Sequence, residues 1–354
     1  MELRIRRPYL SFAALSVAAL GTTLAACGST ADERITAVRA ASPAHWRAAV
    51  PIRRVLDLSS PRHDGTILVT AAGHLALLLP SGAVHQFAAG PAGYANPGGE
   101  EPYIALSTGE RVASASCRFP RQTLYVLRLQ KGPGVTAVDS RGEARGFASL
   151  PRHGLENGIA FDSTGRFGHR LLVTATNASR TTVYAIDCRG SVSTLTTTAP
   201  KLEGGITVAP ATFGRFAGDL IAPDENSGRI YAISPNGRSR LLANSGLAHG
   251  GDVGVESAGF VPPGFRAASS ALVADRRTPG NPHPGDDAVL RIDGSSLIAA
   301  GVGSGDLIVA TEGGAQTDAI RCTGVSCRVR QVADGPPIAH LEGHIVFTEG
   351  RTGY

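Results

Sequence analysis

A unit of two short strands and a glycine-containing turn recurs along this 354-residue chain. Its spacing, roughly 45 to 60 residues, limits the fold more than any other feature. The first strand of each unit begins with two or three aliphatic residues, at 67–70, 171–174, 220–223, 271–274 and 307–310. A second apolar strand then ends at a turn, at 74–79, 135–139, 183–187, 230–234 and 289–293. Units of this size bury an apolar face only by packing against one another.

Together with a weaker strand after each turn and one before each unit, the pattern predicts four-stranded blades. We therefore expect an all-β fold, a six-bladed β-propeller over residues 51–354. Exchange of strands between the chain ends would close the ring and remove exposed edges. Glu342–Phe347 starts a blade with little chain after it, and the unit 64–92 could accept it. Val55–Leu58 also aligns with an innermost strand, so which chain end completes which blade stays open.

The segment 153–240 carries the sharpest motifs, GIAFDSTGR, LLVTATN, VYAID and LIAPDENSGRIYAIS. It resembles six-bladed propellers of the NHL and gluconolactonase (TolB-like) type, and as an architecture the resemblance covers residues 51–354. In gluconolactonases a divalent ion held by Glu, Asn and Asp polarises a lactone carbonyl and activates water. The matching residues implied here are Glu342, Asn157 and Asp252, or Glu156 and Glu203.

The N-terminus reads as an export signal. Arg4, Arg6 and Arg7 precede an apolar stretch that ends in Leu24-Ala25-Ala26-Cys27, which resembles the bacterial lipobox. We expect residues 1–27 to be the signal, with Cys27 lipidated, and residues 28–50 to be a flexible tether. The product would be anchored to the outer face of the cell membrane. Whether export uses the general or the twin-arginine route stays open.

Charge and cysteine content narrow the function classes. The formal net charge of +5 comes with no polybasic run, which excludes a nucleic-acid footprint. We expect a monomer.

An oxidising, exported setting favours disulfides. Cys322 and Cys327 flank a four-residue turn and are predicted to pair, which leaves Cys117 and Cys188 for each other.

A glutamate precedes an apolar run in five places: Glu101, Glu156, Glu203, Glu256 and Glu342. In a propeller the innermost strands all start at one end of the central axis. We therefore expect these carboxylates to converge there with Asp224, Glu225, Asp275 and Glu312. Such a cluster needs cations, protonation or arginine partners. Oxygen ligands favour Ca²⁺, or another divalent cation, and Asn157, Asp252 and His344 are additional candidate ligands.

Two alternatives stay open for these glutamates. They could pair with arginines of nearby loops, such as Arg152, Arg276 and Arg277, and have a purely structural role. His340, Glu342 and His344 alternate, so on a regular strand they share a face. A single transition metal could touch all three only if a bulge shortened the strand.

Two functions follow as hypotheses. The first is a lipid-anchored extracytoplasmic binding or scaffold protein. It would hold a divalent cation where the carboxylates converge at one end of the central axis, and its partner would be an envelope ligand or protein. The alternative is a metal-dependent hydrolase that acts on a lactone or related ester. The sequence contains no G-x-S-x-G, Walker A or H-E-x-x-H motif that would favour another catalytic class.

Overall fold

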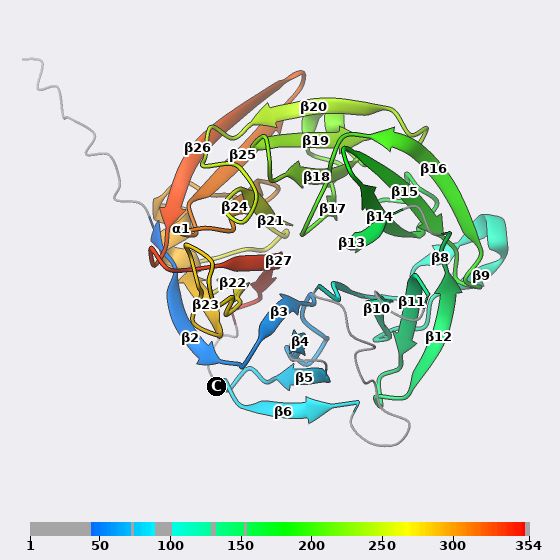
Figure 1. Ribbon diagram of the computed structural model, residues 1–354, viewed down its shortest axis with the longest axis horizontal. Coiled ribbons are helices and arrows are strands. Elements are labelled where there is room, and N and C mark those ends of the chain that lie inside the picture. The colour runs from blue at the N-terminus through cyan, green and yellow to red at the C-terminus, as the bar shows by residue number, and fades with distance from the viewer. Residues whose placement is uncertain (1–43, 72–73, 89–100, 129–131, 152–153, 351–354) are drawn as a thin grey trace, which may run out of the picture. The chain divides into compact units, whose positions relative to one another are not determined.

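The computed structural model describes residues 44–71, 74–88, 101–128, 132–151 and 154–350, which form an all-β, propeller-like fold (Figure 1). The predicted signal with Cys27, and the tether up to residue 43, lie outside these residues. Residues 44–51 form strands β1 (Ala44–His45) and β2 (Arg47–Pro51), so the folded unit begins inside the predicted tether. No helix in the described part of the chain is long and apolar enough to cross a membrane.

Four sheets each contain four antiparallel strands in chain order. Each sheet runs from its first strand, near the centre of Figure 1, to its last strand at the periphery. The first two sheets are β3 (Val55–Leu58), β4 (Ile67–Ala71), β5 (His74–Leu78), β6 (Val84–Phe87), and β7 (Ile104–Leu106), β10 (Leu124–Arg128), β11 (Gly134–Val138), β12 (Ala144–Ser149). The next two are β13 (Leu155–Phe161), β14 (Leu171–Asn177), β15 (Arg180–Ile186), β16 (Val192–Ala199), and β17 (Thr207–Val208), β18 (Leu220–Asp224), β19 (Arg229–Ile233), β20 (Ser239–Asn244).

A fifth sheet has nine strands in the order β1-β26-β25-β24-β21-β27-β22-β23-β2. One parallel pairing, of Ala258 with His344, joins β21 to β27. On one side of this pairing, β21, β24, β25 and β26 repeat the order of the four-stranded sheets, and β1 adds an edge strand beside β26. On the other side, the same order is made by β27, β22, β23 and β2. Bounds of the remaining strands are β21 (Val255–Phe260), β22 (Ser270–Asp275), β23 (Ala288–Asp293), β24 (Leu307–Thr311), β25 (Thr317–Thr323), β26 (Ser326–Asp334) and β27 (Leu341–Thr348).

Strands from both chain ends therefore flank β22 and β23. The C-terminal strand β27 pairs with β22 as the innermost strand, and β2 pairs with β23 as the outermost. The unit 64–92, considered above as the acceptor, already has its own innermost strand, β3. The sequence left open which strand pairs with this unit, and in the structure β3 pairs with β4.

The strands predicted from the aliphatic repeat are confirmed. Every residue of β18 and of β22 is buried, as expected for strands covered on both faces. Aromatic side chains fill part of the space between sheets, where Phe119, Tyr125 and Phe161 pack edge to face. A short helix that the strand pattern did not predict, α1 (Gly294–Ala299), follows β23.

Both predicted disulfides are confirmed. Cys117, on the short hairpin of β8 (Arg111–Val112) and β9 (Cys117–Arg118), is bonded to Cys188 in the turn after β15. Cys322 and Cys327 are directly opposed on β25 and β26. Each crosslink closes a loop and so restricts the unfolded chain.

Candidate functional site

Acidic side chains gather where the innermost strands begin, which we call the acidic end. Glu256 and Glu342 are the second residues of β21 and β27. Glu312 follows β24, and Glu101 lies just before β7. In an antiparallel sheet the second strand ends where the first begins, so residues from both positions meet. We define the acidic cluster as Glu101, Tyr103, Glu256, Arg276, Glu312, His340 and Glu342.

Tyr103 lies at the centre of three carboxyl groups. Its hydroxyl is 2.6 Å from Glu256 Oε1, 3.1 Å from Glu342 Oε2 and 3.5 Å from Glu101 Oε2. A phenol has one proton to donate, so it donates to one carboxylate at a time. Burial, followed by the charge of Glu342, raises the pKa of Glu101 to about 8 and that of Glu256 well above its ordinary value. A protonated carboxyl can then donate to the phenol oxygen.

Two members of the cluster, Arg276 and His340, are basic. Arg276 Nη1, just past the end of β22, lies 3.2 Å from Glu342 Oε1 and 3.4 Å from Glu101 Oε1. His340 Nε2 lies 2.8 Å from Glu312 Oε1 and 3.4 Å from Glu342 Oε1. Burial works to raise the pKa of Glu342, but hydrogen bonding from His340 and the charge of Arg276 outweigh it and lower that pKa.

The protonation of His340 follows from the same contacts. Burial works to lower the pKa of this imidazole, but hydrogen bonds to Glu312 and Glu342 raise it to about 10. His340 is 1% exposed and Glu312 is 4% exposed. Glu312 Oε2 and His340 Nδ1 are buried and have no hydrogen-bond partner among the described residues. Such atoms normally find a protein, water or ion partner.

Two more carboxyl groups, those of Glu203 and Glu225, lie beside the cluster. Lys201 Nζ is 3.2 Å from Glu203 Oε2 and 4.0 Å from Glu225 Oε2. Burial, followed by the charges of Glu312 and Glu203, raises the pKa of Glu225 to about 8. Carboxyl groups therefore outnumber the cations Arg276, His340 and Lys201 at this end of the fold.

Three of the five glutamates singled out in the sequence come together. One ligand oxygen from each of Glu101, Glu256 and Glu342 lies within 4.8 Å of the others, and Glu312, His340 and Glu342 form a second such group. Glu203 pairs with Lys201 instead. Glu156 is buried on β13, where its charge adds to burial in raising the pKa of Tyr184.

Two of the additional candidate ligands, Asn157 and His344, have partners outside the acidic cluster. The Asn157 amide donates to Leu202 O at 2.7 Å and to Thr176 Oγ1, and it accepts from Thr174 Oγ1. These bonds use both the oxygen and the nitrogen of the amide. We therefore no longer consider Asn157 a candidate metal ligand and consider Glu312 instead. Asp252 contacts Glu225 through its backbone N–H.

The two other acids expected at this end have local partners. Asp224 accepts from the Ser227 hydroxyl in the turn after β18. Asp275 accepts the backbone N–H groups of His340 and Asp286. Both carboxylates therefore hold loops of the acidic end in place.

His344 pairs with Asp57 and does not join the cluster. Its Nδ1 is 2.9 Å from Asp57 Oδ2, and its Nε2 is 3.1 Å from the carbonyl oxygen of Ile206. Burial works to lower the pKa of His344, but the charge of Asp57 and their hydrogen bond raise it. The preceding residue, Gly343, has a φ of +68°, and an added Cβ would collide with the Asp57 carboxylate.

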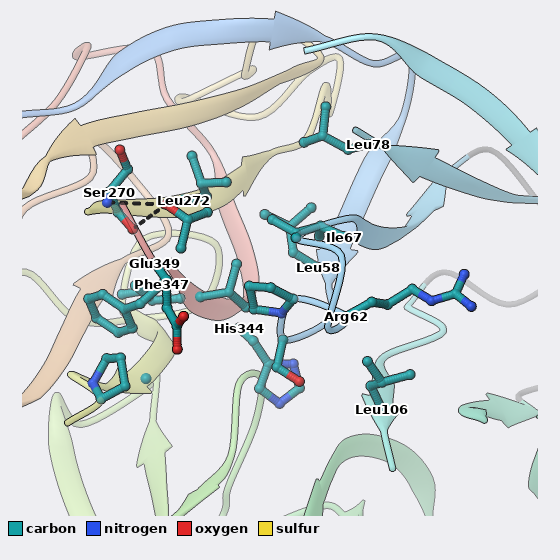
Figure 2. Close-up of a pocket in the computed structure, with 18 of the residues that line it drawn as sticks. Leu58, Arg62, Ile67, Leu78, Leu106, Ser270, Leu272, His344, Phe347 and Glu349 are labelled. Carbon is teal, nitrogen blue, oxygen red and sulfur yellow. Dashed lines mark hydrogen bonds between the residues drawn. The ribbon is translucent and has the colours of Figure 1, made fainter. Parts of the chain in front are cut away.

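An open cavity of about 1220 Å³ lies at the opposite end of the innermost strands (Figure 2). It extends from His344 into the interface between the β3–β6 sheet and the part of the nine-stranded sheet that contains β22. This interface is lined by the leucine and isoleucine side chains of Leu58, Ile67, Leu78 and Leu272. The cavity is therefore separate from the acidic cluster, whose residues do not line it.

Sequence reasoning missed Tyr103 and Asp57. Tyr103 stands two residues after Glu101 in EEPYIAL, and Asp57 stands in the innermost strand β3. A polar residue inside an otherwise apolar innermost strand was the available signal for Asp57.

No family model and no curated protein sequence matches this chain. Similar solved structures include regucalcin, a calcium-binding protein from Agrobacterium tumefaciens, with 12% identity, 85% and 82% of the two chains covered and a TM-score of 0.48. Virginiamycin B lyase from Staphylococcus aureus has 10% identity, 80% and 74% coverage and a TM-score of 0.44. A putative TolB from Agrobacterium tumefaciens has 11% identity, 81% and 88% coverage and a TM-score of 0.44. At these levels the function of this chain has to be derived from its own residues.

Proposed function

We propose that this chain is an exported, lipid-anchored propeller of six blades that binds a divalent cation in its acidic cluster. The anchor is proposed from the lipobox-like sequence ending at Cys27. The six-blade count is supported by the strand order, because the nine-stranded sheet divides at the pairing of Ala258 with His344 into two four-strand sets, with β1 as an added strand at the edge of one set. Strands β2 and β27, from opposite chain ends, would then complete one blade and close the ring.

The observation that carries the cation proposal is the convergence of Glu101, Glu256 and Glu342. Their ligand oxygens lie within 4.8 Å of one another. Glu256 and Glu342 belong to the neighbouring strands β21 and β27 of the nine-stranded sheet, and Glu101 precedes β7 of another sheet. Ca²⁺ binds oxygens at about 2.3–2.6 Å, so ligands on opposite sides of one ion are separated by about 5 Å. Burial, followed by the charge of Glu342, raises the pKa values of Glu101 and Glu256, and a bound cation would favour their ionised forms.

Burial favours binding over hydrolysis. Glu256 is 4% and Glu342 is 1% exposed, and Arg276 contacts both Glu342 and Glu101. A catalytic ion needs an open coordination position that substrate can reach. We therefore rank a cation-binding scaffold first and keep the metal-dependent lactone or ester hydrolase as the alternative.

Calorimetric titration of the chelator-treated protein with Ca²⁺, Mn²⁺ and Zn²⁺ tests the proposal. We expect saturable binding of at least one of these ions, weakened at least ~10-fold by Glu256→Gln, since a ligand charge is lost. Glu110→Gln is the matched control, because Glu110 is a buried carboxylate that bonds to Ser107 and Thr108 outside the cluster. Absence of binding, or equal weakening by both variants, would overturn it.

A further inference from the structure

We infer that the acidic cluster holds two cation positions bridged by Glu342. The first is the carboxylate position of the proposed function, formed with Glu101 and Glu256. The second is formed by Glu312, His340 and Glu342, and its donors suit a transition-metal ion such as Zn²⁺ or Mn²⁺. The inference rests on the proposed function for the first position only.

The two oxygens of Glu342 face different partners. Oε2 is 3.1 Å from the Tyr103 hydroxyl, which also contacts Glu256. Oε1 is 3.4 Å from His340 Nε2. One carboxylate group can therefore give an oxygen to each position, as bridging carboxylates do in two-metal sites.

The spacing at the second position fits a small ion. A tetrahedral ion with ligands at about 2.0–2.2 Å keeps its ligand atoms about 3.3–3.5 Å apart. His340 Nε2 is 3.4 Å from Glu342 Oε1 and 2.8 Å from Glu312 Oε1. Of these two contacts, only the one with Glu312 has to lengthen, by about half an ångström. All three ligand atoms lie within 4.8 Å of one another.

A second observation is independent of this spacing. Glu312 is 4% exposed, and its Oε2 has no hydrogen-bond partner among the described residues. A buried carboxylate oxygen without a partner is costly, and an ion bound by both Oε1 and Oε2 of Glu312 would satisfy it. The backbone N–H of Glu312 is bonded to Gly254 O and its carbonyl oxygen to Leu341 N, so the residue is held firmly beside His340.

The donor types distinguish the two positions. Three carboxylates suit Ca²⁺, which prefers oxygen ligands. An imidazole with carboxylates suits Zn²⁺ or Mn²⁺. Each position can therefore be removed by its own substitution, His340→Gln for the second and Glu256→Gln for the first.

The test uses the full-length, chelator-treated chain with calorimetric titrations of Ca²⁺ and Zn²⁺. We expect His340→Gln to weaken Zn²⁺ binding at least 30-fold and to leave Ca²⁺ affinity within threefold. Glu256→Gln should do the reverse. Because Zn²⁺ can bind surface imidazoles, His85→Gln on the exposed strand β6 is the control and should change neither affinity. If His340→Gln does not fold, as judged by circular dichroism, Glu312→Gln takes its place.

Electron paramagnetic resonance of the Mn²⁺-loaded protein provides a second readout. Two bridged ions give a spin-coupled spectrum, which Glu256→Gln and His340→Gln should each convert to that of a single ion. Zn²⁺ affinity that is insensitive to both His340→Gln and Glu312→Gln overturns the inference, and Ca²⁺ binding can survive that result. A different result would contradict the proposed function itself, namely wild-type protein that binds neither Ca²⁺ nor Zn²⁺.

Discussion

The imidazole Nδ1 of His344 lies 2.9 Å from the Asp57 carboxylate, and this ion pair joins the C-terminal strand β27 to β3. Asp57 is fully buried and also accepts the backbone N–H groups of Ile104 at 2.8 Å and His344 at 2.7 Å. His344 Nε2 reaches Ile206 O, just before β17. The pair therefore connects strands of four different sheets at the centre of the fold.

Asp57→Asn should cost about 3–5 kcal/mol of unfolding free energy, since it leaves a buried cation without its partner. Urea denaturation followed by circular dichroism measures this loss. The control is Asp139→Asn, which breaks the exposed pair with Arg141 and should cost no more than about 1 kcal/mol. Equal losses in the two variants would show that the central pair has no special role.

The chelator-treated protein should become less stable as pH rises from 5 to 9. The pKa of Glu101 and that of Glu225 are each raised from 4.5 to about 8, so the folded state binds more protons than the unfolded state between these values. The pKa of the His340 imidazole is raised from 6.5 to about 10, so this group acts in the same direction over a higher pH range. We expect the melting temperature to fall by more than ~4 °C across this range.

Added Ca²⁺ should reduce that fall, because an ion compensates the ionised carboxylates. Scanning calorimetry at several pH values, with and without the ion, measures both effects. Glu101→Gln removes one of the titrating groups and should flatten the dependence. A melting temperature that rises from pH 5 to pH 9 in chelator would contradict the assignment of these pKa values.

Sequence periodicity located the strands and the acidic end, because both follow from the repeat itself. Glu256 and Glu342 converge since each is the second residue of an innermost strand. The family resemblance suggested Asn157 as a ligand and strand alternation suggested His344, but both lie where strand registers shift, and their side chains bond to other partners. In β3 the register shift falls at Leu56, the position that Glu256 occupies in β21. The innermost strand β3 therefore has no glutamate at this position.

Other site residues depend on contacts that no local pattern contains. Tyr103 reaches Glu256 across 153 positions of the chain, and Asp57 reaches His344 across 287. Such pairings are set by how the sheets assemble around the axis. The sequence therefore predicted where a site would lie more successfully than which side chains complete it.

Tyr103→Phe should cost about 1–3 kcal/mol of unfolding free energy in chelator, because the buried carboxyl groups of Glu256 and Glu342 lose the hydroxyl with which one of them at a time is hydrogen-bonded. The aromatic ring and its packing are kept. Saturating Ca²⁺ should recover part of the loss by giving those oxygens a new partner. Tyr184→Phe is the control, since its hydroxyl is 3.5 Å from Pro151 O and should contribute less. An equal cost for both variants would argue against a carboxyl-bridging role for Tyr103.

Cys27→Ser should release the protein from the membrane fraction, because the proposed anchor consists of acyl chains on this cysteine. Fractionation of cells and incorporation of labelled palmitate measure the change. Cys327→Ser alters a disulfide of the β25–β26 hairpin and should leave both membrane retention and labelling intact. Retention of an unlabelled Cys27→Ser protein would remove the proposed anchor.

Ca²⁺ binding at pH 6.5 should release about one proton or more per ion, because Glu101 has a pKa of about 8 and has to ionise before it can bind the metal. Calorimetric titrations in two buffers of different ionisation enthalpy give this number directly. Glu101→Gln cannot release that proton, so both its affinity and its proton count should fall. Binding without proton release at pH 6.5 would mean that the ion uses carboxylates already ionised, such as Glu342, whose pKa is lowered. The proton count thus reports which carboxyl groups of the acidic cluster hold the ion.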